Sequence, residues 1–449
     1  MAQAGLRTLL ALVEVLRPAL TRPGFDNLVV LFIGWIRATG TRSVTGALVA
    51  AGAAGRVHHE GFHRFFSRGT WSPDQLGRLV LEFVLRRIRV ETPVRLVLDD
   101  TLAPKKGPHV FGIGCHLDPM RTTKRQKVFD FGHCWVVLAL LLPMPFSRRA
   151  WALPLFFRLY RTQKWCERHR QPYRKKTELA REMLDLLVLL TGARRVELSA
   201  DSAYCCGTVT RGLSQRIVLF GAMRPDAALT SVPPPRRAGQ RGRPRIVGPR
   251  VAKPEALVAD TRVPWQQCQA QLYGRMQLVH YKACHAQWYR ACGTRLLSIV
   301  VVRVTTGNVP YRVFFSTDPT TSVVDLLETY AGRWAIEVCF RDLKQLFGFA
   351  DSSARTQAAV ERVAPFVGVS YTLLVLWAQL NPVALRLATP PRRPWYRHKE
   401  GLAFADLLRA ADAAARARPV LDPAGRINNL RFTERRTVIP RQQALKFAG

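Results

Sequence analysis

The sequence predicts a mixed α/β protein in which helices come first, a sheet-based core follows, and a β-rich insertion divides that core. Two observations lead to this fold class. Short apolar runs alternate with a helical segment between residues 94 and 222, an order typical of a mixed sheet covered by helices. Residues 225–312 then break the alternation, with a Pro/Arg/Gly stretch followed by further β-rich runs.

The first elements can be placed from apolar spacing. Residues 1–90 are rich in Leu, Ala and Arg and predict a helical domain, which we expect to bind DNA. The first part of the core, 91–224, should contain five strands and one long helix. The strands are expected at 94–100, 134–142, 153–160, 195–201 and 216–222, and the helix at 177–190. The last two strands leave room for a short helix between them.

The remaining elements complete the core. The insertion, 225–312, opens with the basic stretch 231–250, which cannot form a packed core, and β-rich runs at 296–304 and 309–317 follow it. The second part of the core, 313–385, should include a helix from about Ser322 to Phe347 and a further helix at about 355–380. The basic C-terminal region, 386–449, should hold one more helix.

The charge of the chain narrows the class of partner. Its 68 Lys and Arg against 31 Asp and Glu give a formal net charge of +37 and a pI near 11.1. Such an excess opposes compaction unless a polyanion meets it, so we expect double-stranded DNA as partner. Apolar runs such as 28–36 and 135–142 are too short to span a bilayer, and we expect no membrane partner. Nine scattered cysteines without a C-x-x-C pair indicate a reducing cytosol.

The most informative motif is Y-x2-R-x3-E-x6-K, formed by Tyr330, Arg333, Glu337 and Lys344. At about 100° per residue, the last three fall within roughly 60° of Tyr330 around one helix. A separate apolar stripe follows helical spacing and comprises Ile336, Phe340, Leu343 and Phe347. The helix should therefore bury one face and present a phenol, an acid and two cations on the neighbouring face, a set that suits a metal ion and a phosphate backbone. The simpler explanation is a solvated charged face.

Three acids lie where a metal-dependent nuclease needs them. Asp99 ends the first predicted strand, Asp201 ends the fourth, and Glu337 lies on the late helix. Three hard oxygen ligands with open positions suit Mg²⁺, and two such ions can activate an attacking oxygen and stabilise the leaving one. Each strand acid also has a simpler explanation: Asp99 suits a turn, and Asp201 suits a helix N-cap.

In these motifs the chain resembles the DDE transposases, in the cut-and-paste insertion-sequence group that carries the YREK signature. The matching segments are DDT at 99–101, ADSAY at 200–204 and the four signature residues. STD at 316–318 and PWYRHK at 394–399 are also similar to segments of this group. The resemblance runs in order from about residue 60 to 400.

The resemblance implies an RNase H-like catalytic fold with Asp99, Asp201 and Glu337 as the catalytic and metal-binding triad. The family pattern D-x-T selects Asp99, and Asp100 stays an alternative. Mg²⁺ is the expected cofactor, with Mn²⁺ as a substitute. Arg333 and Lys344 would grip phosphates at the cleaved end, and Tyr330 would place that DNA. The reaction would be cleavage at terminal inverted repeats and strand transfer into target DNA by at least a homodimer. We expect a prokaryotic, cytoplasmic, nucleoid-associated protein.

Another basic motif lies in the insertion. Arg241, Arg243 and Arg245 form RGRPR, a pattern typical of segments that lie in an A·T-rich minor groove. A flexible basic linker is the alternative, and either form adds phosphate contacts.

Two other functions compete with transposition. His59-Glu60-Gly61-Phe62-His63 matches the H-E-x-x-H motif of zinc proteases, with Glu82 available as a third ligand. Gly61 weakens a helix there by about 1 kcal/mol relative to Ala, and a protease leaves the charge and the late helix unexplained. A non-catalytic or domesticated DNA-binding derivative is the other alternative. The cysteines and histidines do not form a four-ligand set, so we expect no structural zinc.

Overall fold

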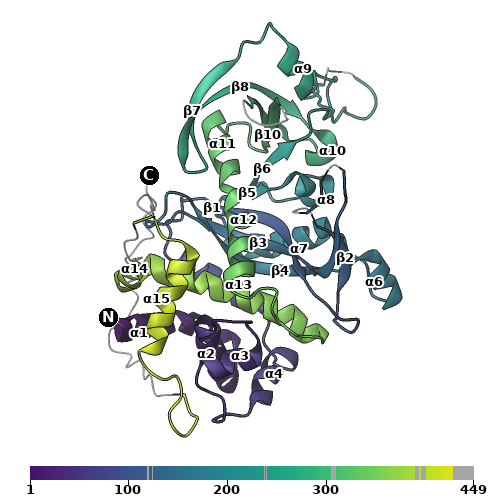
Figure 1. Cartoon of the computed structure of the whole chain (residues 1–449). Coiled ribbons are helices and arrows are strands. Elements are labelled where there is room, and N and C mark those ends of the chain that lie inside the picture. Colours follow the sequence, from purple (N-terminus) through teal and green to yellow (C-terminus); the bar gives the residue numbers. More distant parts are fainter. Residues whose placement is uncertain are drawn as a thin grey trace. The chain divides into compact units, whose positions relative to one another are not determined.

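The computed structural model describes residues 1–118, 121–123, 125–236, 238, 240–304, 310–389, 394–395 and 401–427. The chain forms two compact units, whose elements Figure 1 labels. Unit 1 comprises Met1–Arg89, Asp100–Arg174 and Ile336–Gly449. Unit 2 comprises Val90–Asp99 and Lys175–Ala335.

Unit 1 begins with helices, as predicted for residues 1–90. Thr21 and Ser43 N-cap the second and third of them, each side chain accepting a hydrogen bond from a first-turn N–H group. Most of the N-terminal helices pack against one or both of two later helices of the same unit, α13 (Gln357–Leu380) and α15 (Phe404–Arg416). The N-terminal elements are α1 (Ala2–Val13), η1 (Glu14–Ala19), α2 (Arg22–Arg37), α3 (Val44–Ala50), α4 (His59–Ser67) and α5 (Pro73–Leu85).

The long strand of unit 1 is β3 (Phe129–Leu142). β2 (Gly114–Leu117) pairs antiparallel with its start, and β4 (Trp151–Tyr160) pairs antiparallel with its remainder. β1 (Val94–Pro104) also neighbours β3, and its residues from Asp100 onward belong to unit 1. From Gly132 to its end β3 is buried throughout, as expected of a strand covered on both faces. The short helix α6 (Gln163–Arg168) follows β4.

The core helix of unit 1 is α13, which lies along β4 (Figure 1). Gly368 permits this packing, because a Cβ there would overlap the ring of Phe157 on β4. By length and composition α13 resembles a membrane span, with a mean hydropathy of 1.6. However, 94% of that apolar stretch is buried inside the protein, as expected of a core helix. α12 (Trp334–Leu346), from Ile336 onward, and α14 (Pro382–Ala388) also belong to unit 1.

Unit 2 is built on a sheet with the strand order β1-β5-β6-β10-β9-β8-β7. β1, β5 (Val196–Ala200) and β6 (Ile217–Met223) run parallel. From β6 onward each neighbour is antiparallel, through β10 (Tyr311–Ser316), β9 (Leu296–Arg303), β8 (Arg275–Gln287) and β7 (Gln266–Leu272). The helices of the unit are α7 (Lys176–Thr191), η2 (Ser202–Tyr204), α8 (Gly207–Thr210), α9 (Pro254–Ala259), α10 (Tyr289–Cys292) and α11 (Val323–Gly332).

The mixed α/β fold class is confirmed, and so are the strands and the helix predicted between 94 and 222. Strands β7, β8 and β9 of the predicted insertion, 225–312, extend the core sheet. They do so because they share one hydrophobic cluster with β6 and α11, comprising Val218, Phe220, Ala270, Val279, Val300, Leu326 and Leu327.

The helix predicted from about Ser322 to Phe347 is also corrected. α11 ends at Gly332 and α12 begins at Trp334, with Arg333 in right-handed helical conformation between them. The Arg333 N–H donates to the Tyr330 carbonyl three residues back, a tightened turn that closes α11. The apolar stripe is confirmed on α12, where Ile336 and Leu343 are fully buried. Of the predicted PWYRHK segment, 396–399 lie outside the described residues, as do 428–449 of the C-terminal region.

Candidate active site

Two of the predicted acids lie at the same edge of the sheet in unit 2. β1 and β5 are parallel neighbours, and their register pairs Leu98 with Ala200. β1 continues to Pro104, so Asp99 does not end this strand as predicted. Asp99 and Asp201 instead occupy equivalent positions, one residue beyond the last pair of the parallel β1–β5 ladder. Both are half-buried. Asp201 precedes η2, yet its side chain makes no capping hydrogen bond, so helix capping does not explain this acid.

A guanidinium lies against the first of these acids. Nη1 of Arg333 donates to Oδ2 of Asp99 at 2.8 Å. Only 14% of the Arg333 side chain and 18% of the Asp99 side chain are exposed, so solvent screens this ion pair little. Arg333 was predicted to hold phosphate, and here it neutralises a carboxylate of the predicted triad.

Tyr330 belongs to the same group of side chains. The Arg333 guanidinium lies 5.8 Å from the centre of its ring, and Phe314 of β10 packs 4.8 Å from it on another side. Burial raises the pKa of Tyr330, and the nearby Asp201 carboxylate raises it further, while Arg333 opposes both. The phenol therefore stays protonated at neutral pH and can donate a hydrogen bond.

The start of α11 is fixed at the opposite edge of the sheet. Ser322 N-caps the helix, its hydroxyl accepting from the Asp325 N–H at 3.1 Å. Ten residues of α-helix span about 15 Å, close to the length of the five-residue strand β5. The last turn is tied to that strand, because Ser199 Oγ donates to the Thr329 carbonyl at 3.0 Å. α11 thus carries Tyr330 and Arg333 to the edge that holds Asp99 and Asp201.

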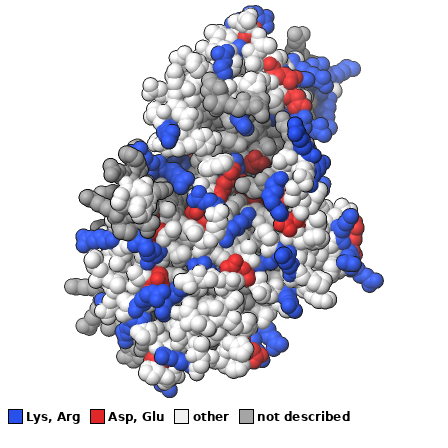
Figure 2. Space-filling model, viewed as in Figure 1, with Lys and Arg blue, Asp and Glu red and all other residues white. Residues whose placement is uncertain are grey.

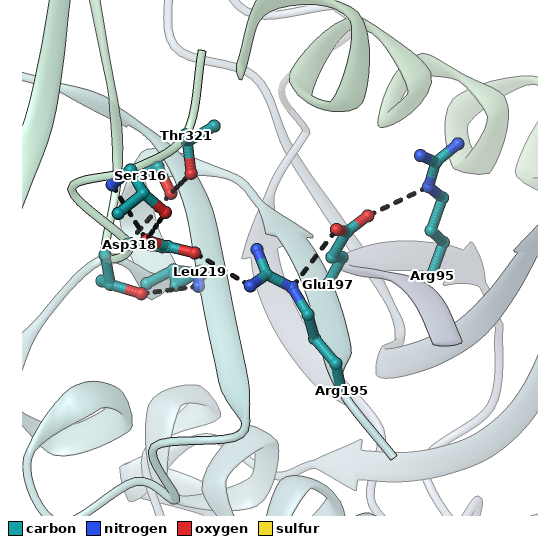
Figure 3. A network of polar contacts seen from close by, with 9 residues as sticks. Arg95, Arg195, Glu197, Leu219, Ser316, Asp318 and Thr321 are labelled. Carbon is teal, nitrogen blue, oxygen red and sulfur yellow. Dashed lines mark hydrogen bonds and ion pairs between the residues drawn. The ribbon is translucent and has the colours of Figure 1, made fainter. Parts of the chain in front are cut away.

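A polar network holds the turn before α11 (Figure 3). Arg195 lies 2.9 Å from Asp318 and 3.6 Å from Glu197, and Arg95 donates to Glu197 at 3.0 Å. Burial alone would raise the pKa of Asp318, but hydrogen bonds from Thr320 and Arg195 outweigh it and hold that pKa below its ordinary value. The network links the amino ends of β1 and β5 to the segment after β10.

The STD segment at 316–318 therefore has a positioning role. The Thr317 hydroxyl accepts from the Leu219 N–H at 2.8 Å, and the Thr317 N–H donates back to the Leu219 carbonyl. Ser316 is fully buried, and its hydroxyl accepts from the Asp318 N–H at 3.1 Å. Sequence reasoning noted this segment only as a family likeness and did not single out Arg195 or Glu197. The charges that bracket β5 were the available signal.

The other signature residues belong to unit 1. Glu337 lies in the first turn of α12 and is half-buried. Lys344 lies on the same helix, where burial lowers its pKa and Asp118, Cys134 and Asp100 oppose that shift. Asp100 accepts a hydrogen bond from the Cys134 thiol at 3.3 Å. Asp99 and Asp100 thus have different surroundings, the first in unit 2 with Arg333 and the second in unit 1.

No metal ligand set is assembled among the described residues, since none of their His, Cys, Asp and Glu side chains form a group of three suited to an ion. At this position in unit 2 the acids are Asp99 and Asp201. Both supply hard carboxylate oxygens, the donor type that Mg²⁺ requires. The residues therefore fit such an ion in donor type, with Arg333 holding a competing positive charge beside Asp99.

The RGRPR segment lies on an anchored loop of unit 2. Thr230 and Arg250 form an antiparallel bridge at its base, and the Ser231 N–H donates to the Pro249 carbonyl at 2.9 Å. The three predicted DNA-binding side chains are all exposed: Arg241, Arg243 and Arg245. On the face drawn in Figure 2, basic side chains gather in the region of α9, which follows this loop.

The H-E-x-x-H motif lies on the exposed part of α4. The rings of His59 and His63 are 5.9 Å apart and perpendicular, and His59 stacks on His58. Glu60 pairs with Arg64 at 2.5 Å instead of facing the histidines, and the proposed third ligand, Glu82, is held by Arg78 at 2.8 Å. This geometry gives a zinc protease no support.

Comparison with known families gives the class of the protein. Residues 15–292, more than half of the chain, match the family described as "DDE superfamily endonuclease". Residues 291–382 match the family described as "Archaeal putative transposase ISC1217". The chain belongs to the DDE superfamily endonucleases. The first match contains Asp99 and Asp201, and the second contains Tyr330, Arg333, Glu337 and Lys344.

Comparison with individual proteins adds little. No curated protein matches the chain. A cryo-EM structure of a piggyBac transposase synaptic complex with hairpin DNA is similar with a TM-score of 0.41 and 9% identity, over 90% of this chain and 74% of that chain. A likeness this distant carries no argument about the present chain.

Proposed function

We propose that the chain is a DNA transposase of the YREK group that cleaves DNA at transposon ends and joins them to target DNA. The observation that carries the proposal is in unit 2, where Asp99 and Asp201 follow the last paired residues of two adjacent parallel strands and Arg333, at the end of α11, forms an ion pair with Asp99. Membership in the DDE superfamily and the match of residues 291–382 to a transposase family support it.

The triad in this proposal is Asp99, Asp201 and Glu337, in an RNase H-like arrangement. Asp99 is preferred to Asp100 because it follows the residue paired with Ala200, whereas Asp100 is engaged by the Cys134 thiol. The Asp201 side chain makes no capping hydrogen bond to η2, so its carboxylate is not committed to that helix. Glu337 follows Arg333 by one helical turn along the chain.

The same three carboxylates would hold Mg²⁺, for which Mn²⁺ substitutes. When bound, the metal would supply Lewis-acid stabilisation of the charge that develops on the transferring phosphate. Arg333 compensates the negative charge of Asp99. We infer that it leaves this carboxylate when the site is loaded and binds a DNA phosphate, for which its planar fork is suited.

Other residues place the DNA in this proposal. Tyr330 would donate its phenolic hydrogen to a phosphate oxygen, since burial keeps the hydroxyl protonated. Lys344 would add a point charge near the cleaved end. The loop that carries Arg241, Arg243 and Arg245 would track a minor groove, and its anchored base limits the entropy lost on binding. Synapsis of two ends requires at least a homodimer, acting on the nucleoid in a prokaryotic cytoplasm.

Excision from a donor plasmid tests the proposal. The plasmid carries the DNA that natively flanks the gene around a selectable marker, and the protein is supplied in trans. We expect excision by the wild type and by His59→Ala, and none by Glu337→Gln. Excision that survives Glu337→Gln would overturn the triad, and excision lost only in His59→Ala would revive the protease alternative.

A further inference from the structure

The ribbon formed by β2 and β3 in unit 1 turns its apolar face to solvent and its polar face inward. Its register pairs Cys115 with Phe131 and Leu117 with Phe129. Because side chains alternate along a strand, these four lie on one face of the ribbon. That face is open: the exposed fractions are 45% for Leu117 and 59% for each phenylalanine, and Cys115 is also exposed. Antiparallel ribbons normally turn their apolar face inward.

The opposite face of the ribbon is polar and largely buried. His116 pairs with Asp130 in the register and is only 9% exposed, with its ring 5.8 Å from that of Tyr160. Asp130 also holds Arg121 at 2.6 Å. Register slippage would exchange the two faces, so this polar face fixes the apolar one toward solvent.

The segment that joins β2 to β3 is basic, and hydrogen bonds are described at two places in it. The Asp118 N–H donates to the Val128 carbonyl at 2.8 Å, and the Thr123 N–H donates to the Gln126 carbonyl at 2.8 Å. The sequence from 119 to 129 contains four Lys and Arg residues and no acid. Arg121 turns back to Asp118 and Asp130, while Arg125 and Lys127 are exposed. A cationic tip therefore adjoins two exposed aromatic rings.

We propose that this β2–β3 ribbon binds target DNA, with Phe129 and Phe131 as an apolar wedge against a distorted base step. The inference rests on the proposed transposase function. Exposed phenylalanines beside cations are the means by which minor-groove proteins unstack and kink a duplex. Residues two apart on a strand are about 6.7 Å apart, close to two base steps of about 3.4 Å each.

The chemistry favours target DNA over the transposon end. Phenylalanine offers no hydrogen bonds to base edges, so the wedge would respond to deformability and not to sequence. That property suits a duplex of no fixed sequence, whereas end recognition requires base readout. A second copy of the chain is disfavoured as the occupant, because two such tips would bring like charges together.

The test measures DNA binding by the full-length protein in EDTA, which separates it from cleavage. The variants are Phe129→Ser/Phe131→Ser, Arg125→Gln/Lys127→Gln and, as an exposed apolar control on α7, Leu189→Ser, whose side chain is 80% exposed. The probes are a mixed-sequence duplex with a central mismatch, which is easily kinked, the same duplex fully paired, and the native flanking DNA.

We expect the double phenylalanine variant to bind the mismatched duplex about tenfold more weakly, with the preference over paired DNA lost. The double cation variant should lower the log–log salt slope by about 1.8 on both duplexes. Leu189→Ser should match the wild type. Circular dichroism confirms folding, which surface changes should leave intact.

Three results would overturn the inference. Unchanged binding of the mismatched duplex by the double phenylalanine variant would show that the rings do not contact DNA. An equal loss on the native flanking DNA would assign the ribbon to the transposon end. A change in sedimentation without a change in DNA binding would assign the apolar face to self-association. If the wild type fails to excise DNA but still binds the mismatched duplex as expected, the catalytic proposal fails and the ribbon inference stands.

Discussion

The ion pair between Arg333 and Asp99 makes Arg333→Met an informative substitution. Nη1 and Oδ2 are 2.8 Å apart, and less than a fifth of either side chain is exposed. Removing one partner of a buried pair leaves an uncompensated charge, at a cost of about 3–5 kcal/mol. Because both side chains keep some exposure, we expect the lower end of that range, a loss of about 3 kcal/mol in the free energy of unfolding.

A divalent cation should reverse part of this loss. If Asp99 and Asp201 are metal ligands, the ion supplies the positive charge that the Arg333→Met variant lacks. Binding at about 100 times the dissociation constant recovers about 2.7 kcal/mol. In the wild type Arg333 competes for the same carboxylate, so Mn²⁺ should stabilise the wild type less than the variant.

Urea denaturation with and without Mn²⁺, followed by circular dichroism, measures both effects. Arg195→Met is the matched control, since Arg195 also forms a 2.9 Å ion pair in unit 2, with Asp318 at the other edge of the sheet. That variant should lose stability and gain nothing extra from Mn²⁺. Equal stabilisation of all three proteins by Mn²⁺, or an Arg333→Met variant as stable as the wild type, would refute the reasoning.

Three further predictions follow from packing, burial and charge. Gly368→Ala should lower the melting temperature and cost about 1–3 kcal/mol of stability, because the new Cβ would lie 2.7 Å from Phe157 Cε2 and closer to Cζ. Gly61→Ala, whose Cβ would have nothing within 4 Å, should stabilise α4 by up to about 1 kcal/mol, and equal effects of the two substitutions would contradict the packing. Burial lowers the pKa of His133 to about 4, so this histidine contributes about 3 kcal/mol of stability above about pH 6.5 that is lost as the pH falls through 4. Urea denaturation of His133→Gln at several pH values should lack this pH dependence. Replacing the three RGRPR arginines by Gln should lower the log–log salt slope of DNA binding by about 2.7, and an unchanged slope would exclude phosphate contacts by this loop.

Much of the unit 2 site could be predicted from the sequence. Short apolar runs placed β5 and the first half of β1, and the acids that follow these runs, Asp99 and Asp201, could be placed close together because parallel neighbours run side by side. The continuation of β1 to Pro104 was not predicted. Helical spacing likewise placed Tyr330 and Arg333 on one face of a helix. These signals are local, so a single sequence contains them.

The remaining features depend on long-range packing. Periodicity continues through Arg333, so it gave no sign that α11 ends there. β7 and β8 escaped prediction because half-exposed strands rich in Gln lack an apolar period. Their union with the core sheet depends on burial of Ala270 and Val279 with α11, which spacing cannot reveal. The ion pair of Arg333 with Asp99 links residues 234 positions apart in the chain.

The central claim is that Asp99, and not Asp100, belongs to the catalytic triad. The most direct test is metal-dependent cleavage of the native flanking DNA by the Asp99→Asn and Asp100→Asn variants. The two substitutions are chemically identical and adjacent, but Asp99 lies beside Arg333 while Asp100 accepts a hydrogen bond from the Cys134 thiol. Both proteins should bind the DNA in EDTA. The account predicts that Asp99→Asn abolishes cleavage in Mg²⁺ or Mn²⁺ and that Asp100→Asn retains it. Cleavage that survives Asp99→Asn and is lost in Asp100→Asn would contradict it.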